Sequence, residues 1–499
     1  MKQKLQKLKN ILAEIADLKA SIALLEWDQQ TFMPKGGAEA RARQLGTLGK
    51  LEHEMSTSGE LGKLLYELRN SKDSLDPDSD DARMIRFAVK DYERATCVTP
   101  DFVVERAQVT SMANNAWAEA RSNKDFSIFL PHLEKIVDLT LRYIEFFPPA
   151  DHPYDVLLDI FEPEMKTSDV KKIFDELRPK QVSLIKAIGQ KNQVKNSFLH
   201  QSFDEKKQWD FGIEVVTGMG YEMARGRQDK SPHPFTTEFS INDVRITTRI
   251  DPLFFNTMFF STVHEAGHAL YAQGHSQDLE RTNLTEGASL AIHESQSRMW
   301  ENLVARSLTF WEYYYPGLQE YFPQLNGVDL YTFYKGINRV EPSPVRVEAD
   351  EATYNLHIML RLELEIGIIE GRIKVRDLPQ IWNAKMKEYL GVEPADDAQG
   401  VLQDVHWSMG AFGYFSTYAL GNLISVQLWE KINQDIPDIT GQIRTGKSDA
   451  LLGWLRTNIH SHGRKFMPQE LVKKVTGSGI DPAPYLRYLE DKFGKIYGL

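Results

Sequence analysis

The sequence has little cysteine, no long apolar run and no excess of positive charge. Cys97 is the one cysteine among 499 residues, so no disulfide can form within the chain and nothing requires an oxidising compartment. Near the N-terminus, Glu14, Asp17 and Lys19 interrupt the apolar residues, which argues against a secretory signal peptide. No segment approaches the ~20 apolar residues that cross a membrane. We therefore expect a cytoplasmic protein without a membrane partner.

The charge balance excludes a further class of partner. Lysine and arginine total 59 and aspartate and glutamate 70, which gives a net charge of −11. A negative surface disfavours nucleic acid, so we expect no nucleic-acid partner. The chain also lacks internal repeats, low-complexity segments and long linkers. We therefore expect one domain over residues 1–499, with a sizeable hydrophobic core.

Apolar residues recur mostly with helical spacing, which predicts a mainly α fold. One segment differs, because residues 236–250 alternate β-branched residues around Asn242 and Asp243, as in a short hairpin. This small sheet directly precedes the metal motif described next, so we expect it to flank the site. The predicted helices cover residues 8–26, 38–55, 82–95, 99–122, 126–146, 168–189, 204–224, 351–370, 376–388, 417–434 and 482–495.

The metal motif is HEAGH, within a helix that is predicted to begin at Asp251 and Pro252 and to end at Gly274. His264 and His268 are four residues apart, so they lie on one face of the helix, one turn apart. Two imidazoles at that spacing can bind one zinc ion, while the intervening Glu265 faces a zinc-bound water.

The third ligand is less directly indicated. The metzincin class of zinc peptidases would need glycine at position 271 and histidine at position 274, but the chain has tyrosine and glycine there. The remaining candidates are glutamates further along the chain. We prefer Glu294, about two turns into a helix expected to begin near Gly287, because an antiparallel return brings it beside His264. The alternatives are Glu301 and, in the connecting loop, Glu280 and Glu286.

This set of residues predicts hydrolysis. Zinc lowers the pKa of its bound water and polarises a carbonyl, and Glu265 would act as general base. A tetrahedral oxyanion needs further donors, and the segment 404–421 offers His406, Tyr414 and Tyr418. His293 is expected to support a ligand or to contact substrate. His460 and His462 are expected to have structural roles.

Several motifs together resemble the thermostable carboxypeptidase Taq family of metallocarboxypeptidases, across almost the whole chain. They are EWDQQTFMP at 26–34, HPF at 233–235, the Asp-x-Arg-x-Thr pattern at 243–247, HEAGH, HESQ at 293–296, the Val-Arg-x-x-Ala-Asp pattern at 345–350 and the Gly-x-x-Gln pattern at 400–403.

The resemblance implies a helical saddle with a deep groove, related in shape to neurolysin and angiotensin-converting enzyme. Residues 1–200 would form one wall or lid of that groove, and the protein would be a homodimer. It also implies release of single C-terminal residues from peptides, with broad specificity. One zinc ion per chain, replaceable by cobalt, would be held by His264, His268 and Glu294, with Glu265 as base.

A carboxypeptidase must recognise a free carboxylate, which an arginine does well through paired hydrogen bonds. Arg346 and Arg245 are the candidates, although Arg346 could instead pair with Glu348 or Asp350. Through their motifs, His233 and Gln296 are further expected substrate contacts, beside His406 and Tyr418. Two other functions stay open: an oligopeptidase that cuts internal bonds, and a non-catalytic helical peptide-binding protein.

Overall fold

A computed structural model describes residues 1–70 and 75–499 and shows a mainly α fold with one small sheet. The helices are α1 (Lys2–Thr31), α2 (Ala38–Ser56), α3 (Gly59–Arg69), α4 (Asp80–Cys97), α5 (Pro100–Asn123), α6 (Phe126–Glu145), α7 (Asp155–Phe161), α8 (Thr167–Gly189), α9 (Glu205–Gly218), α10 (Phe255–Gln273), α11 (Leu290–Arg298), α12 (Leu308–Tyr321), α13 (Leu330–Ile337), α14 (Tyr354–Ile369), α15 (Leu378–Leu390), α16 (Ser416–Asp435), α17 (Ile439–Arg444), α18 (Asp449–Asn458), α19 (Pro468–Thr476) and α20 (Ala483–Tyr497).

Every helix expected from the apolar periodicity has a counterpart, and the differences lie at the ends. The expected helix over 204–224 ends at Gly218, shortly before Gly220, which has a φ of +104°. The helix with HEAGH starts at Phe255 rather than at Asp251, because the Asp251 carboxylate accepts the Leu253 amide at 2.8 Å and forms a turn. The next helix begins at Leu290, three residues later than expected.

Three strands form the sheet, in the order β1 (Gly226–Lys230), β3 (Asp243–Thr248), β2 (Thr236–Ser240). The antiparallel β2–β3 pair confirms the expected hairpin, with Thr236 opposite Ile246 and an irregularity between Glu238 and Ser240. The parallel pairing of β1 with β3 was not expected. One side of β2 faces away from β3, so β2 is an edge strand.

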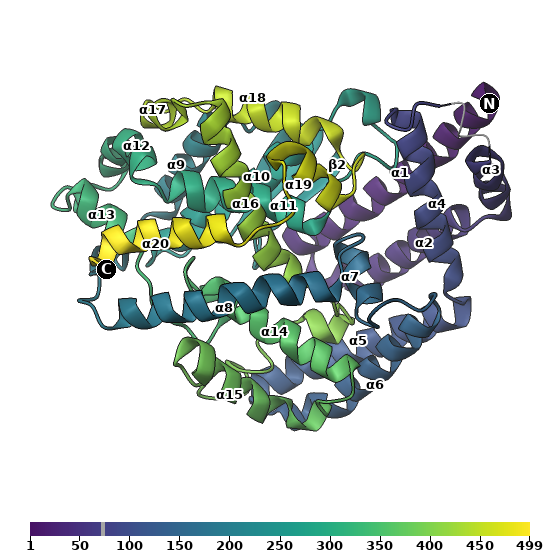
Figure 1. Ribbon diagram of the computed structural model, residues 1–499, viewed down its shortest axis with the longest axis horizontal. Helices are drawn as coiled ribbons and strands as arrows, with labels where there is room; N and C mark the ends of the chain where they lie inside the picture. The colour runs from purple at the N-terminus through teal and green to yellow at the C-terminus, as the bar shows by residue number, and fades with distance from the viewer. Residues whose placement is uncertain (71–74) are drawn as a thin grey trace.

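Figure 1 shows α10, α11 and α16 near the middle of the molecule, with α1–α4 at one end and α12, α13 and α17 at the other. Most buried apolar side chains form one continuous core from Phe102 to Tyr497. A second cluster joins α1, α3 and α4, and it extends to Leu279, Leu284 and Met467 of the C-terminal part. The N-terminal helices are therefore packed directly against the loop that follows α10.

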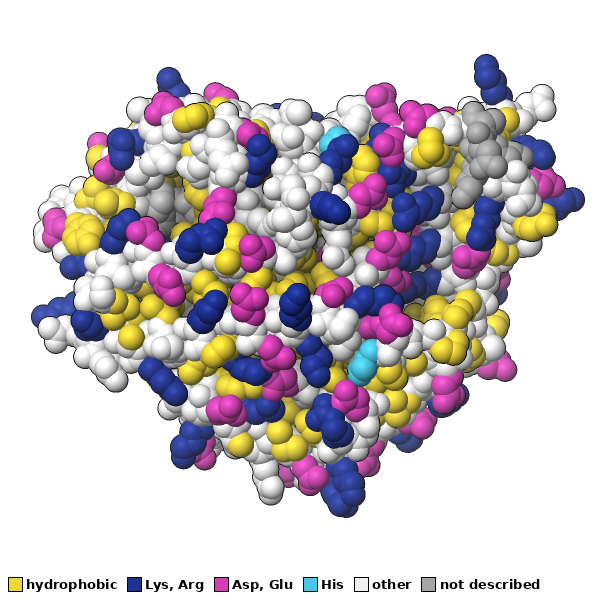
Figure 2. Space-filling view, in the orientation of Figure 1, with side chains coloured by type: hydrophobic (Ala, Val, Ile, Leu, Met, Phe, Trp, Pro, Cys, Tyr) yellow, Lys and Arg dark blue, Asp and Glu magenta, His cyan; other side chains and the backbone are white. Residues whose placement is uncertain are grey.

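The surface carries both signs of charge. Acidic and basic side chains are interspersed over the face shown in Figure 2. Over the described residues, no helix combines the length and apolar character needed to cross a membrane.

Candidate metal centre and active site

The site is built where α10 packs against α11 at very short range. A Cβ atom on Gly267, the glycine of HEAGH, would lie 2.6 Å from the Ser297 Cα atom, so only glycine fits there without displacing backbone. On the other side of α11, a Cβ on Gly421 of α16 would lie 2.6 Å from the Glu294 Cβ. Two glycines thus let three helices approach around the Glu294 side chain.

His264, His268 and Glu294 converge, as the spacing argument and the resemblance both predicted. One ligand atom from each lies within 4.8 Å of the other two. The Nε2 atoms of His264 and His268 are 3.6 and 3.4 Å from Glu294 Oε2. Two imidazole nitrogens and a carboxylate oxygen are a donor set typical of catalytic zinc, which leaves a fourth position open. These residues therefore fit a metal ion.

The other ring nitrogen of each histidine has its own partner. His264 Nδ1 lies 2.9 Å from Glu301 Oε2, and His268 Nδ1 lies 2.7 Å from His293 Nδ1. Such contacts orient a ligand ring and fix which nitrogen carries the proton. Glu301 is therefore placed behind His264 rather than among the converging donors. It belongs to the π-helical segment Met299–Ala305 that continues α11.

Two arginines near the carboxylates keep them ionised. Burial alone would raise the pKa of Glu294, but the positive charges of Arg298 and His264 hold that pKa well below its usual range. The Arg298 Nε atom donates to Glu294 Oε1 at 2.6 Å, and its Nη1 atom donates to Glu301 Oε2 at 3.1 Å. Arg306 also contacts Glu301. An ionised Glu294 is the form that a metal ligand requires.

The expected hairpin does flank the site. Thr236, at the start of β2, donates its hydroxyl to Glu265 Oε2 at 2.7 Å, and the same hydroxyl lies 2.9 Å from the Glu265 carbonyl oxygen. The Glu265 side chain is 7% exposed. This contact, which the sequence did not predict, fixes the direction of the carboxylate proposed as the base.

Arg346 contacts α14 and α16, and its ion pair is not the alternative that the sequence suggested. It pairs with Asp404 at 2.8 Å, not with Glu348 or Asp350, and its Nη1 atom donates to the Tyr354 hydroxyl at 2.9 Å. The same Asp404 carboxylate pairs with the fully buried Arg361 at 2.6 Å. Two arginines thus share one carboxylate, which leaves a net positive charge for an anionic ligand.

Arg346 is connected to the metal residues through aromatic rings. The Arg298 guanidinium lies 4.5 Å from the Tyr354 ring centre, and the Arg346 guanidinium lies 5.1 Å from the Tyr418 ring centre. The Tyr418 hydroxyl is 3.4 Å from His406 Nε2. Burial lowers the pKa of His406 to about 4, so the imidazole is neutral at pH 7. The structure thus brings together Arg346, His406 and Tyr418.

Three other expected substrate contacts are placed differently. Arg245 donates to Asp243 at 2.8 Å and lies 4.4 Å from the ring centre of Trp27, which attaches α1 to the sheet. Gln296 is fully buried, with its Oε1 atom 3.0 Å from His460 Nε2. His233 is exposed and precedes β2 by three residues. These positions favour a structural role for Arg245 and Gln296.

Comparisons with known proteins agree with the site. The profile of the carboxypeptidase Taq (M32) metallopeptidase family matches residues 7–493. The chain is 41% identical to thermostable carboxypeptidase 1 of Thermus thermophilus, over 99% of both chains, and 38% identical to carboxypeptidase 1 of Bacillus subtilis, over 98% of this chain and 97% of the relative. A crystal structure of the M32 carboxypeptidase of Deinococcus radiodurans superposes with a TM-score of 0.97, at 40% identity and full coverage of both chains. The chain therefore belongs to the carboxypeptidase Taq (M32) family and is a metallocarboxypeptidase.

Proposed function

We propose that the chain releases single C-terminal residues from peptides, with broad specificity, using one zinc ion held by His264, His268 and Glu294. The convergence of one ligand atom from each of these residues, two on α10 and one on α11, supports this most strongly. Cobalt fits the same donors. We further propose a single domain over 1–499, with residues 1–200 as one wall of the groove, and a cytoplasmic homodimer.

Each residue of the site has a separate role in the proposed reaction. When bound, the metal lowers the pKa of a water molecule and polarises the scissile carbonyl. Glu265, held by Thr236, accepts a proton from that water and passes it to the leaving amine. Tyr418 and His406, whose side chains lie 3.4 Å apart, would donate to the oxyanion. Arg346, backed by Asp404, binds the C-terminal carboxylate and so restricts cleavage to the last bond.

Zinc titration of variants tests the ligand set. We expect wild-type protein to bind one zinc ion per chain, and Glu294→Ala to lose most of its occupancy, because one of three ligands is gone. Glu301→Gln should bind zinc about 10–100-fold more weakly, since it only orients His264. Glu280→Ala is the control and should bind as wild type does. If Glu301→Gln empties the site while Glu294→Ala stays loaded, the ligand assignment is wrong.

A further inference from the structure

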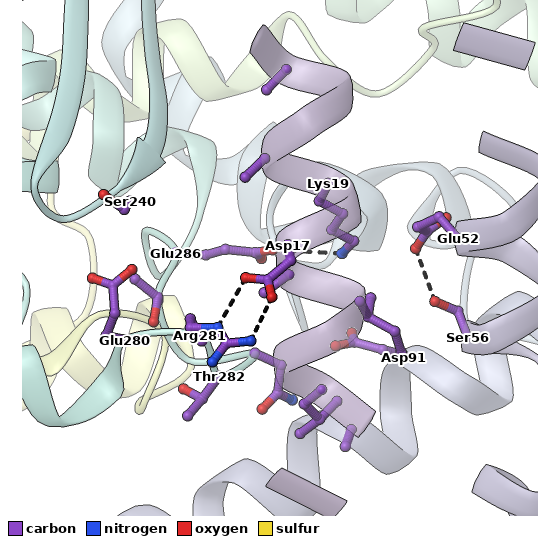
Figure 3. A pocket seen from close by; sticks show the side chains of 18 of the residues that line it. Asp17, Lys19, Glu52, Ser56, Asp91, Ser240, Glu280, Arg281, Thr282 and Glu286 are labelled. Carbon is purple, nitrogen blue, oxygen red and sulfur yellow. Dashed lines mark hydrogen bonds and ion pairs between the residues drawn. The ribbon is translucent and has the colours of Figure 1, made fainter. Parts of the chain in front are cut away.

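A cavity of about 490 Å³ lies between α1, the far end of β2 and the loop that follows α10. Figure 3 shows Asp17 and Lys19 on α1 facing Glu280, Arg281 and Glu286 of that loop, with Glu52 and Asp91 on neighbouring helices. Glu238, Phe239 and Ser240 of β2 also line the cavity, together with apolar side chains of α1, α3 and α4. The metal residues do not line this cavity.

β2 connects the cavity to the catalytic centre. Thr236 contacts Glu265 at one end of the strand, and Glu238 lines the cavity two residues further along. Two residues of a strand span ~7 Å, and their side chains lie on the same face. The cavity therefore begins within two or three peptide residues of the bond that is cut.

The direction of a bound peptide follows from the proposed function, on which this inference rests. The order of packing is β2, α10, α11, α16: Thr236 contacts Glu265 on α10, and Gly421 of α16 contacts Glu294 on α11. Arg346 lies on the α16 side, beside Tyr418. If Arg346 binds the C-terminal carboxylate of a peptide, the rest of the peptide extends from the metal site toward β2. The residues that precede the scissile bond then reach the cavity.

The charges in the cavity are unbalanced. Its lining includes six carboxylates but only two cationic side chains, Lys19 and Arg281. Both cations are already occupied: Arg281 pairs with Asp17, and Lys19 lies 3.9 Å from Glu286. Arg464, behind the lining, pairs with Asp91 at 2.8 Å and lies 3.4 Å from Glu286, which still leaves more carboxylates than cations. For Glu238, no ion pair or hydrogen bond of the side chain is found over the described residues. Burial and the negative charges of Glu286 and Glu280 raise the pKa of Glu238 to about 8. The free carboxyl of Glu238 is therefore mostly protonated at pH 7, and a cation bound beside it would favour the ionised form.

We propose that this cavity is a substrate subsite that binds a positively charged group upstream of the scissile bond, with Glu238 as its specificity-determining residue. The ligand is an ammonium or guanidinium, supplied by a lysine or arginine side chain or by the α-amino group of a short peptide. The enzyme accordingly prefers basic peptides, although its C-terminal preference is broad.

Matched peptides test the subsite. The substrates are acetylated hexapeptides that share their last two residues, which flank the scissile bond. Lysine, glutamine or glutamate is placed, one position at a time, at the second, third or fourth residue of the peptide. At low salt we expect kcat/KM for the best lysine peptide to exceed that of its glutamine counterpart about fivefold, with the glutamate peptide slowest. Salt at 0.5 M should reduce the ratio. Unacetylated glutamine peptides show whether an α-amino group substitutes for lysine.

Two variants test whether Glu238 causes the preference for lysine. Glu238→Gln removes the negative charge that this carboxyl takes up beside a bound cation, with little change in shape, and should bring the lysine-to-glutamine ratio close to one. Glu134→Gln, an exposed glutamate outside the cavity, removes the same charge and should keep the wild-type ratio. If Glu238→Gln does not fold, Glu280→Gln and the salt dependence of the wild-type ratio provide the same test.

The outcomes separate this inference from the proposed function. Equal kcat/KM for all wild-type peptides, with C-terminal release intact, would overturn the subsite alone. A lysine preference that survives in Glu238→Gln would also overturn the role of Glu238. If no peptide loses its C-terminal residue, the proposed function fails.

Discussion

At the residue scale, the catalytic role proposed for Glu265 rests on one hydrogen bond and one position. Thr236 holds the carboxylate from β2, while the histidines on either side of Glu265 in the sequence converge with Glu294. Over the described residues, Glu265 is not one of the three converging donors. Its chemistry can be separated from metal binding by a substitution that keeps its size.

Glu265→Gln should retain zinc and lose activity. An amide of the same size preserves the donor set of His264, His268 and Glu294, but it cannot accept the proton of the attacking water. Loss of a general base lowers kcat by about 10²–10⁴-fold. Metal content and kcat measured on the same preparation check this, and activity within tenfold of wild type in a zinc-loaded sample would contradict the role of Glu265.

Arg346→Ala should reduce kcat/KM for peptides with a free C-terminus at least about tenfold, with zinc retained. Charge-assisted hydrogen bonds from the guanidinium to a carboxylate are lost, and each is worth about 1.5–3 kcal/mol. Arg346→Lys should recover only part, because an ammonium cannot form the paired contact. Asp404 keeps its ion pair with Arg361, which limits the damage to the fold.

Arg245→Ala is the comparison for Arg346. It should destabilise the contact between Trp27 and the sheet, while leaving carboxylate recognition in place. If peptides with a free C-terminus are cut normally by Arg346→Ala but not by Arg245→Ala, the carboxylate is bound by Arg245.

The convergence of His264, His268 and Glu294 was predictable because the information for it is local. The i, i+4 spacing of His264 and His268 defines one helix face, and one short helix–loop–helix return brings Glu294 back. The partner of Arg346 was missed because Asp404 is 58 residues further along the chain. Packing between distant segments, rather than any local pattern, creates that ion pair. The same holds for the contact from Thr236 to Glu265.

At the element scale, long helices were predictable and most short helices were not. The helices that the periodicity missed are all of 14 residues or fewer, which gives too few turns for a clear apolar stripe; they are α3, α7, α12, α13, α17, α18 and α19. Strand β1 has the sequence GRQDK, without apolar alternation, and it is a strand only because it pairs with β3.

Gly267→Ala should separate α10 from α11 and weaken the metal site. The added Cβ would meet the Ser297 backbone at 2.6 Å, which a side-chain rotation cannot relieve. Overpacking of this kind costs about 1–3 kcal/mol of the free energy of unfolding, and the displaced helices should also lower zinc affinity. Thermal unfolding and zinc titration measure the two effects.

The matched control is Gly494→Ala in α20, where nothing lies within 4 Å of an added Cβ. It should be neutral or stabilise the protein by up to about 1 kcal/mol, because alanine favours a helix more than glycine does. Equal behaviour of Gly267→Ala and Gly494→Ala would show that the approach of α10 to α11 does not determine the metal site.

At the scale of the whole molecule, the central helices α10, α11 and α16 hold the site, and α1 lies across the cavity beside it. The family membership makes the chain a metallocarboxypeptidase. With Arg346 as the proposed carboxylate contact, beside Tyr418 and away from β2, cleavage would stop one residue from the end. An oligopeptidase would need no such carboxylate contact.

Mass spectrometry of digestion products tests this account most directly. One peptide with a free C-terminus and its C-terminally amidated form are incubated with zinc-loaded protein and sampled over time. The account predicts a ladder of masses, each smaller by one C-terminal residue, from the free peptide only, and no ladder after chelation of the metal. Internal fragments, or equal cutting of the amidated peptide, would contradict it.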